Sequence, residues 1–199
     1  MKVVKNLLKD ADIFFANRRP ELMQEIGLTA EEAAILKPGI IYCNVSTHGD
    51  RGPRAGRPGF DQVAGSVTGM MVFEGDLENP KIPVINVVND YLVSWIASIG
   101  VMAALRKRAK EGGSYRVHVS LSRVALWITS LGIFDKSYVE SVANKTPEHA
   151  EKKPELFILE TAVGTYRGYT DQVHMSETPE YYRTVLVPRG SSQPVWLVR

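Results

Sequence analysis

The chain has 199 residues, of which 44% are hydrophobic and 23% are charged, a composition that is typical of globular proteins and excludes a disordered or fibrous chain. Its formal net charge of +2 excludes a strong field that would draw it to nucleic acid or to an anionic membrane. Cys43 is the single cysteine, which excludes an internal disulfide and leads us to expect a reducing, cytoplasmic environment.

Residues 1–45 alternate between helical and strand-like patterns. Thr29 and Glu32 have the spacing of a capping box, which predicts a helix that ends before Pro38 because the residue before a proline disfavours helical geometry. Pro20 suits a helix start and Gly27 a helix end. In chain order we predict an amphipathic helix at 3–8, a strand at 11–16, helices at 20–27 and 29–37, and a strand at 40–45.

The middle of the chain opens with a loop and continues with helices and strands. Residues 47–59 are rich in Gly, Pro and Arg, so this segment has no face that can pack in a core. Asn89 and Asp90 are both suitable N-caps for the longest predicted helix, from Tyr91 to Lys110, whose last turns are basic and suit the helix dipole. The other predicted elements are a helix at 60–72, strands at 82–88 and 115–121, and a helix at 122–134.

This alternation of helices and strands predicts an α/β fold with a Rossmann-like parallel sheet and flanking helices. The composition changes after Ser137, where polar and charged residues predominate. We therefore divide the chain into a partial α/β domain at 1–136, a linker at 137–155, and a small, irregular C-terminal segment at 156–199 whose short strands pack back on the domain.

We predict neither a membrane attachment nor a metal site. The segment MKVVKNLLKDADIFF is too charged for a signal peptide, and the apolar stretch Leu92 to Leu105 is shorter than the ~20 residues that span a bilayer. The histidines have no metal-ligand spacing, and we interpret His118 as an ordinary strand residue. Because Cys43 lies in an apolar run, we expect its thiol to be buried and unreactive.

Four segments of the chain, in this order, resemble family III CoA-transferases, the group that includes carnitine dehydratase and the bile-acid-inducible proteins. Together they cover residues 10–135 well and the tail loosely. The segments read ADIFFANRRPELMQEIGL, KPGIIYCNVSTHGDRGPRAGRPGFDQVAGSVTGMM, PVINVVNDYLVSWIASIGVMAALRKRAKEGGSYRVHVSL, and a weaker tail around HMSETPEYYRT and PVWL. The resemblance implies the same α/β fold and a transfer of CoA between carboxylic acids.

Asp90 matches the catalytic aspartate of this family, whose carboxylate attacks an acyl-CoA thioester and becomes an aspartyl-CoA thioester. Its expected place at a helix N-terminus fits that role, because free N–H groups and the helix dipole stabilise an anion there. The same N–H groups are candidates to stabilise the oxyanion on the attacked carbonyl. Without the resemblance, Asp90 reads as an N-cap that contributes ~1 kcal/mol.

The resemblance also implies where CoA and the substrate bind. Asn17 and Arg19 match the family's Asn-Phe-Arg-Pro segment, which contacts the CoA nucleotide, and Arg18 replaces its aromatic residue. Residues 47–59 match the Gly-rich loop of the family on the substrate side. The implied CoA contacts are Asn17, Arg18, Arg19, Thr47 and Gly49, and the implied substrate-side residues are His48, Arg51 and Asp61.

The resemblance leaves three readings open. The first is an active CoA-transferase that forms a homodimer through the apolar faces of residues 91–110 and 122–134. The second is an inactive descendant or one subunit of a split enzyme, because the family usually begins with a strand and Gly-rich turn ahead of the ADIFF segment. The third, an acyl-CoA racemase, is disfavoured because Phe60 stands where racemases carry an acid/base histidine.

Overall fold

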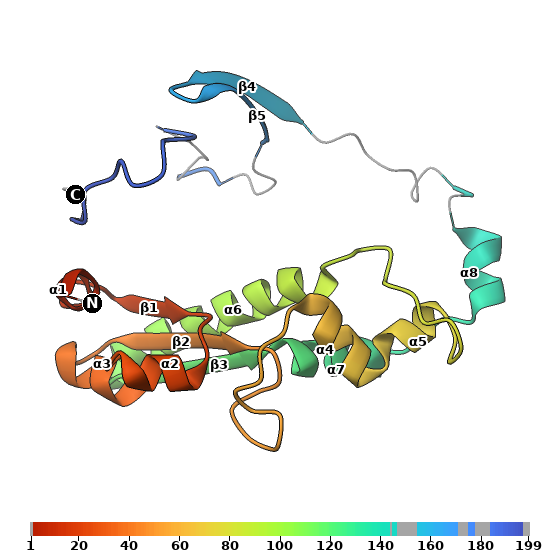
Figure 1. The fold of residues 1–199 in the computed structure, drawn as a ribbon, viewed down its shortest axis with the longest axis horizontal. Helices are drawn as coiled ribbons and strands as arrows, with labels where there is room; N and C mark the ends of the chain where they lie inside the picture. The colour runs from red at the N-terminus through yellow and green to blue at the C-terminus, as the bar shows by residue number, and fades with distance from the viewer. Residues whose placement is uncertain (1, 144, 147–154, 171–174, 178–183, 197–199) are drawn as a thin grey trace. The chain divides into compact units, whose positions relative to one another are not determined.

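The computed structural model describes residues 2–143, 145–146, 155–170, 175–177 and 184–196. The chain divides into two compact units, residues 1–133 and 134–199, which are considered separately below. The first unit is a three-stranded sheet with helices on both faces (Figure 1). The predicted α/β class is therefore confirmed.

The sheet is parallel and has the order β1 (Ile13–Ala16), β2 (Ile41–Ser46), β3 (Tyr115–Ser120). Its register pairs Ala16 with Asn44 and Ser46 with Ser120, so the carboxyl ends of the strands lie along one edge. The central strand β2 is the most deeply buried, since Ile41 and Cys43 have no exposed surface. Burial also raises the pKa of the Cys43 thiol, as expected of an unreactive cysteine.

Seven helices flank the strands in the first unit, and their local signals explain where most of them begin. In the capping box, the Thr29 N–H donates to Glu32 Oε2 (2.8 Å) and the Glu32 N–H donates to Thr29 Oγ1 (3.2 Å), as predicted. The helices are α1 (Lys2–Leu8), α2 (Pro20–Glu25), α3 (Ala30–Leu36), α4 (Asp61–Thr68), α5 (Met70–Glu74), α6 (Val88–Glu111) and α7 (Leu121–Ser130).

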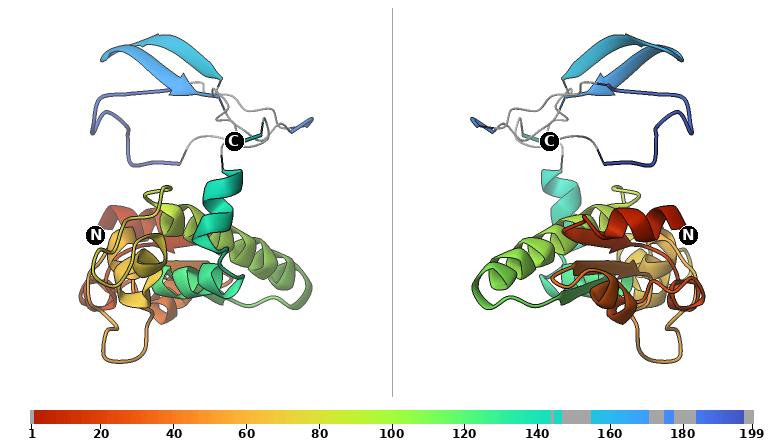
Figure 2. Two further views of the ribbon diagram at one scale, coloured as in Figure 1. Left: turned by 90° about the vertical axis from the view of Figure 1, so that its right-hand side faces the viewer. Right: turned by 90° about the vertical axis from the view of Figure 1, so that its left-hand side faces the viewer.

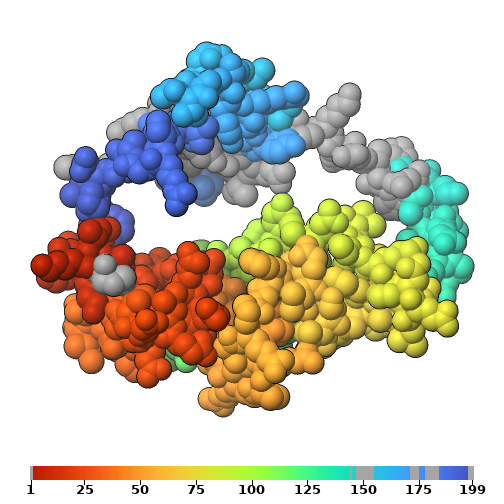
Figure 3. All heavy atoms as spheres, in the orientation of Figure 1, coloured from red at the N-terminus to blue at the C-terminus, as the bar shows by residue number. Residues whose placement is uncertain are grey.

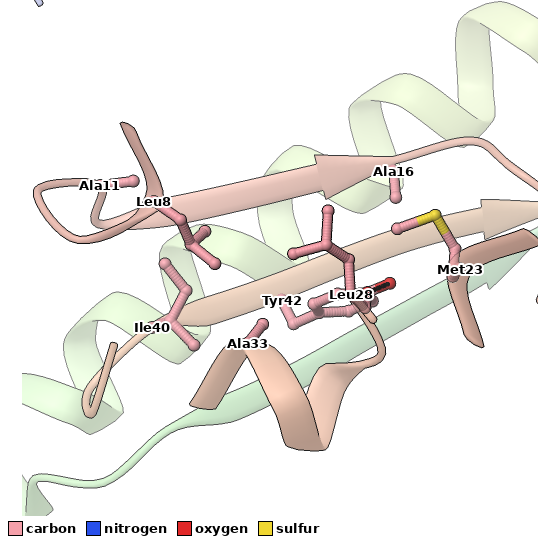
Figure 4. Packing of buried hydrophobic residues seen from close by; sticks show 8 residues of the cluster. All are labelled: Leu8, Ala11, Ala16, Met23, Leu28, Ala33, Ile40 and Tyr42. Carbon is pink, nitrogen blue, oxygen red and sulfur yellow. Dashed lines mark hydrogen bonds between the residues drawn. The ribbon is translucent and has the colours of Figure 1, made fainter. Parts of the chain in front are cut away.

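Each face of the sheet has its own hydrophobic core. On one face, residues from α1, α2, α3 and the first two strands pack around Leu28, whose side chain is only 1% exposed (Figure 4). On the other face, residues of α4, α6 and α7 pack against Val45 and Val119. Helix α6 runs along this second face (Figure 2), where Gly100 permits close approach: a Cβ there would lie 2.7 Å from Val117 Cγ1.

Two predicted elements between β2 and α6 are wrong. No strand forms at 82–88, and the sheet of the first unit consists of β1, β2 and β3. Pro83 has no backbone N–H for strand pairing, and Val84 is 92% exposed, so little packing holds this segment in a strand. The helix predicted at 60–72 is interrupted by Gly69, whose φ of 82° is left-handed and separates α4 from α5.

Helix α6 is longer than predicted and begins at Val88 instead of Tyr91. Its N-cap is Val87, which makes no side-chain cap, so neither Asn89 nor Asp90 has the capping position expected for it. By length and composition α6 could cross a membrane, and it is the one such helix in the described ranges. It packs along β2 and β3 of the sheet, and 22% of its most apolar 18-residue stretch is buried.

The second unit contains α8 (Lys136–Val142) and an antiparallel hairpin of β4 (Leu156–Thr161) and β5 (Gly164–Tyr169). The segment expected to be a linker therefore starts with a helix, capped by Asp135, whose carboxylate accepts from the Ser137 N–H at 2.9 Å. Most of the QVHM segment and most of the SETPEYYRT segment lie outside the described residues. Packing of this unit against the first stays a prediction.

The core around Leu28 predicts a large stability loss on truncation. Leu28→Ala should lower the free energy of unfolding by about 2–5 kcal/mol, because it removes a fully buried side chain and leaves a cavity. Ile35→Ala is the matched control on α3, since Ile35 is 79% exposed and its loss should cost little. Urea unfolding followed by circular dichroism measures both, and similar losses for the two variants would contradict this assignment of the core.

Candidate functional site

The carboxyl edge of the parallel sheet gathers the residues that the sequence marks as functional. Asn17 follows β1, Thr47 follows β2 and Leu121 follows β3, and ligands of α/β folds bind outside such an edge. Helix α6 leads directly into β3 through a short turn and packs along it, so its N-terminus lies at the same edge. The topology therefore brings Asp90, Asn17 and the 47–59 loop to one side of the sheet.

Asp90 lies in the first turn of α6, and its side chain is exposed. Its backbone N–H donates to Asp61 Oδ2 at 2.9 Å. Asp61, the first residue of α4, is only 3% exposed. A buried carboxylate from another helix thus holds the main chain of the predicted nucleophile.

The second oxygen of Asp61 contacts the residue before Asp90. Asn89 Nδ2 donates to Asp61 Oδ1 at 3.1 Å, and Asn89 is fully buried between α4 and α6. The amide oxygen of Asn89 is buried without a hydrogen-bond partner among the described residues, which costs about 1–3 kcal/mol. The Asp61 carboxylate, predicted to face substrate, is therefore directed at the start of α6 through both of its oxygens.

The environment of Asp90 differs from the one expected for a helix N-terminus. The pKa of Asp90 is raised, first by partial desolvation of its otherwise exposed carboxyl beside the sheet and second by the negative charge of Asp61. Three N–H groups of this helix end are also occupied: that of Asp90 by Asp61, that of Tyr91 by the Val87 carbonyl, and that of Val88 by the Ile85 carbonyl. These three groups cannot serve an oxyanion, contrary to the expectation for this helix end.

The loop between β2 and α4 is closed at its base by Thr47. The Thr47 hydroxyl donates to the Gly59 carbonyl at 2.6 Å, and the Thr47 carbonyl accepts from the Ser122 N–H at 2.9 Å. Gly59 has no room for a side chain, since a Cβ there would lie 2.7 Å from Thr47 Cγ2. Thr47 is 7% exposed and its hydroxyl closes the base of the loop, and its predicted contact with CoA stays a prediction.

Beyond this base, the loop projects from the body of the first unit (orange in Figure 3) and is basic. Arg51 is exposed, and His48 Nδ1 lies 3.3 Å from Ser122 Oγ. Burial lowers the pKa of His48, and the charges of Arg54 and Arg57 lower it further. The loop therefore presents permanent cations beside a neutral imidazole, which suits an anionic ligand.

Residues 17–19 form the exposed end of β1 and the start of α2. Asn17, Arg18 and Arg19 are all exposed. Arg19 is the N-cap of α2 and makes no side-chain cap, and its guanidinium has no ion-pair partner among the described residues. These side chains are thus available to a phosphate, and their predicted contact with CoA stays a prediction.

A polar network on β2 and β3 escaped the sequence interpretation. His118 Nε2 lies 2.9 Å from Ser46 Oγ, which also accepts from the Gly49 N–H at 3.0 Å. Asp50 Oδ2 lies 3.7 Å from His118 Nδ1 and 3.1 Å from an Arg116 nitrogen. The network ties the 47–59 loop to the edge strand, and its signal in the sequence was the alternation of Arg116 and His118 on one face of β3.

This network predicts a pH dependence of stability. Burial lowers the pKa of His118 and outweighs the opposing charge of Asp50, so the unfolded chain takes up a proton at higher pH than the folded one. The contribution of His118 is therefore fully present above its ordinary pKa of 6.5 and is lost as the pH falls below it. His118→Gln should flatten the decline of the melting temperature between about pH 7.5 and pH 5.5. An unchanged slope in thermal melts would count against the assignment.

Comparison with known proteins shows which family this chain is related to. Residues 1–177 match CoA-transferase family III. The chain is 33% identical over 141 residues to the acetyl-coenzyme A transferase nodX of Hypoxylon pulicicidum, covering 67% of this chain and 24% of that protein. It is 30% identical over 129 residues to (R)-2-hydroxy-4-methylpentanoate CoA-transferase of Clostridioides difficile, covering 64% of this chain and 32% of that protein.

Solved structures share the fold. The hypothetical protein Rv3272 of Mycobacterium tuberculosis superposes with a TM-score of 0.60 at 24% identity, over 82% of this chain and 43% of that one. A CAIB/BAIF family protein of Brucella suis gives a TM-score of 0.60 at 21% identity, again over 82% of this chain and 43% of its own. The chain thus spans a quarter to a third of these curated relatives and less than half of the solved structures. The family match, which extends over most of the sequence, shows that the chain belongs to CoA-transferase family III.

Proposed function

We propose that the protein transfers CoA from an acyl-CoA thioester to a carboxylic acid, with Asp90 as the acyl-accepting carboxylate. The observation that carries this proposal is the exposed Asp90 carboxylate at the carboxyl edge of the sheet, whose backbone N–H donates to the buried carboxylate of Asp61. Relatives named as CoA-transferases support the reaction class. Their names differ in the acid, so the acid that this chain uses is left open.

The proposed reaction conserves atoms and charge at every step. A carboxylate oxygen of Asp90 attacks the thioester carbonyl, the C–S bond breaks, and CoA departs as a thiolate, which leaves a mixed anhydride of the acyl group and Asp90. The thiolate attacks the Asp90 carbonyl and releases the first acid, which leaves an aspartyl-CoA thioester. The carboxylate of the second acid attacks the carbonyl of this thioester and displaces the CoA thiolate, which gives a second mixed anhydride. The thiolate then attacks the acyl carbonyl of that anhydride, forming the new acyl-CoA and releasing the Asp90 carboxylate.

Asp90 must be ionised to act as the nucleophile. Burial and the charge of Asp61 raise its pKa from an ordinary value of 3.8. Activity should therefore be lost on acidification at a higher pH than for an isolated aspartate, because protonation removes the attacking oxygen's charge.

We propose that CoA is bound through its phosphates by residues that follow β1 and by the projecting loop that follows β2. Asn17 and Arg19 are exposed at the end of β1, and Arg51 is exposed on the projecting loop. Guanidinium groups bind phosphates through two parallel N–H donors, which suits the anionic nucleotide of CoA. Gly49, with a φ of 93°, lets the loop turn close to this edge.

We also propose that the protein is cytoplasmic and that it forms a homodimer or pairs with a partner subunit. One side of α6 carries large apolar side chains that are more than 60% exposed: Tyr91, Trp95, Ile99 and Met102. An apolar stripe of this size is typical of an interaction surface. A relative in Chloroflexus aurantiacus is named as an alpha subunit, succinyl-CoA–L-malate CoA-transferase, which keeps the split-enzyme alternative open.

The covalent step predicts a dependence on Asp90. Incubation with an acyl-CoA should give a CoA adduct on the wild-type chain in intact-mass spectrometry, and Asp90→Asn should abolish it because an amide is not a nucleophile here. Asp76→Asn is the matched control, since Asp76 is an aspartate whose carboxylate accepts two backbone N–H bonds within a surface turn. An adduct that persists in Asp90→Asn would rule out Asp90 as the acceptor.

CoA binding predicts a dependence on Arg19. Calorimetric titration with CoA should give saturable binding, weakened about tenfold by Arg19→Ala through loss of a charge-assisted bond to phosphate. Arg106→Ala is the control, because Arg106 is exposed near the far end of α6. An absence of binding at millimolar CoA would favour the inactive-descendant or split-enzyme alternative for this chain.

A further inference from the structure

We propose that Asp61 is a positioning residue for Asp90: its buried carboxylate fixes the first turn of α6 so that the Asp90 side chain is presented at the open edge of the sheet. This inference rests on the transfer reaction proposed above for the role of Asp90. It reassigns Asp61, because a side chain that is 3% exposed and bonded through both oxygens is not placed to contact substrate.

The geometry divides the work between two consecutive residues of α6. Asp61 Oδ2 accepts the Asp90 N–H at 2.9 Å, and Asp61 Oδ1 accepts Asn89 Nδ2 at 3.1 Å. Asn89 is fully buried whereas Asp90 is exposed, so the pair fixes which side of the helix faces inward. A single carboxylate thereby fixes both the position of the first turn of α6 relative to α4 and the rotation of that turn about the helix axis.

Residues of α4 and α5 surround the buried amide of Asn89. Gly65, one turn after Asp61, is buried, and a Cβ there would lie 4.0 Å from Asn89 Nδ2. Met70 Sδ lies 3.9 Å from the same nitrogen. The Asn89 amide therefore fits between these residues and stays beside Asp61.

A purely structural tie would not need a charge at this place. The Asp61 carboxylate has no ion-pair partner among the described residues, and a buried carboxylate without a cation is costly even where hydrogen bonds satisfy its oxygens. Its charge also raises the pKa of the Asp90 carboxyl, and Asp61 is the charged group that acts on Asp90 in the described part of the chain. Costly charges of this kind concentrate at functional sites, which favours a role in the reaction over a role in packing.

The decisive experiment compares Asp61→Asn and Asp61→Ala with the wild type, and Asp76→Asn serves as the control. Carbon-13 NMR titration of the Asp90 carboxyl should show a lower pKa in Asp61→Asn, since the variant removes the neighbouring negative charge and keeps an acceptor oxygen. Amide exchange at Asp90 should accelerate about tenfold in Asp61→Ala, which has no acceptor. Asp76→Asn should change neither quantity.

In transfer assays, Asp61→Ala should lower kcat by on the order of 10²-fold with little change in the Kd for CoA, since a displaced nucleophile loses its alignment. Asp61→Asn should restore part of kcat and shift the acidic limb of the pH profile downward. The NMR and exchange readouts need no turnover, so a response there in a chain that transfers no CoA would support the positioning role and reject the transfer reaction. A lower melting temperature with unchanged Asp90 titration and exchange would overturn the inference.

Discussion

Parallel pairing of three strands is the constraint on which the site depends. Because β1, β2 and β3 run in one direction, their carboxyl ends meet at a single edge, and the chain must return across the sheet through helices. Those returns cover both faces and bury the central strand, where Ile41 and Cys43 are fully enclosed. Helix α6 is such a return, so its N-terminus and Asp90 reach the same edge as Asn17, although 73 positions separate the two residues in the sequence.

Local signals made most of the first unit predictable. The capping box of Thr29 and Glu32 and the apolar runs of the strands depend on neighbours within a few residues, and the structure confirms them. The strand predicted at 82–88 failed because a strand needs a partner, and alternating apolar residues do not show whether one is available. The prediction of where α6 begins was wrong for a related reason: the N–H of Asp90 donates to Asp61, 29 residues earlier in the sequence, and not to a local cap.

The site shows the same division between local and distant information. Family motifs identified Asp90 and Asp61 as positions of interest, but only the structure shows that one is exposed and the other bonded behind it. His118 looked like an ordinary strand residue because its partners, Ser46 and Asp50, come from another strand and a loop. Register between parallel strands decides such contacts, and a single sequence does not specify register across 72 residues.

A carboxylate buried next to Asp90 needs a physical reason, since the charge of Asp61 opposes ionisation of Asp90. An Asp90 close to its ordinary pKa of 3.8 would be fully ionised at neutral pH but weakly basic, and a weakly basic carboxylate is a poor nucleophile. Desolvation and the charge of Asp61 raise that pKa, which makes the attacking oxygen more basic. Asp61 thus holds the backbone of Asp90 through a hydrogen bond and raises the energy of its anion through charge. An asparagine at position 61 would keep an acceptor for the hydrogen bond and lose the charge, which is why a charged residue suits a reactive Asp90 better than a neutral cap would.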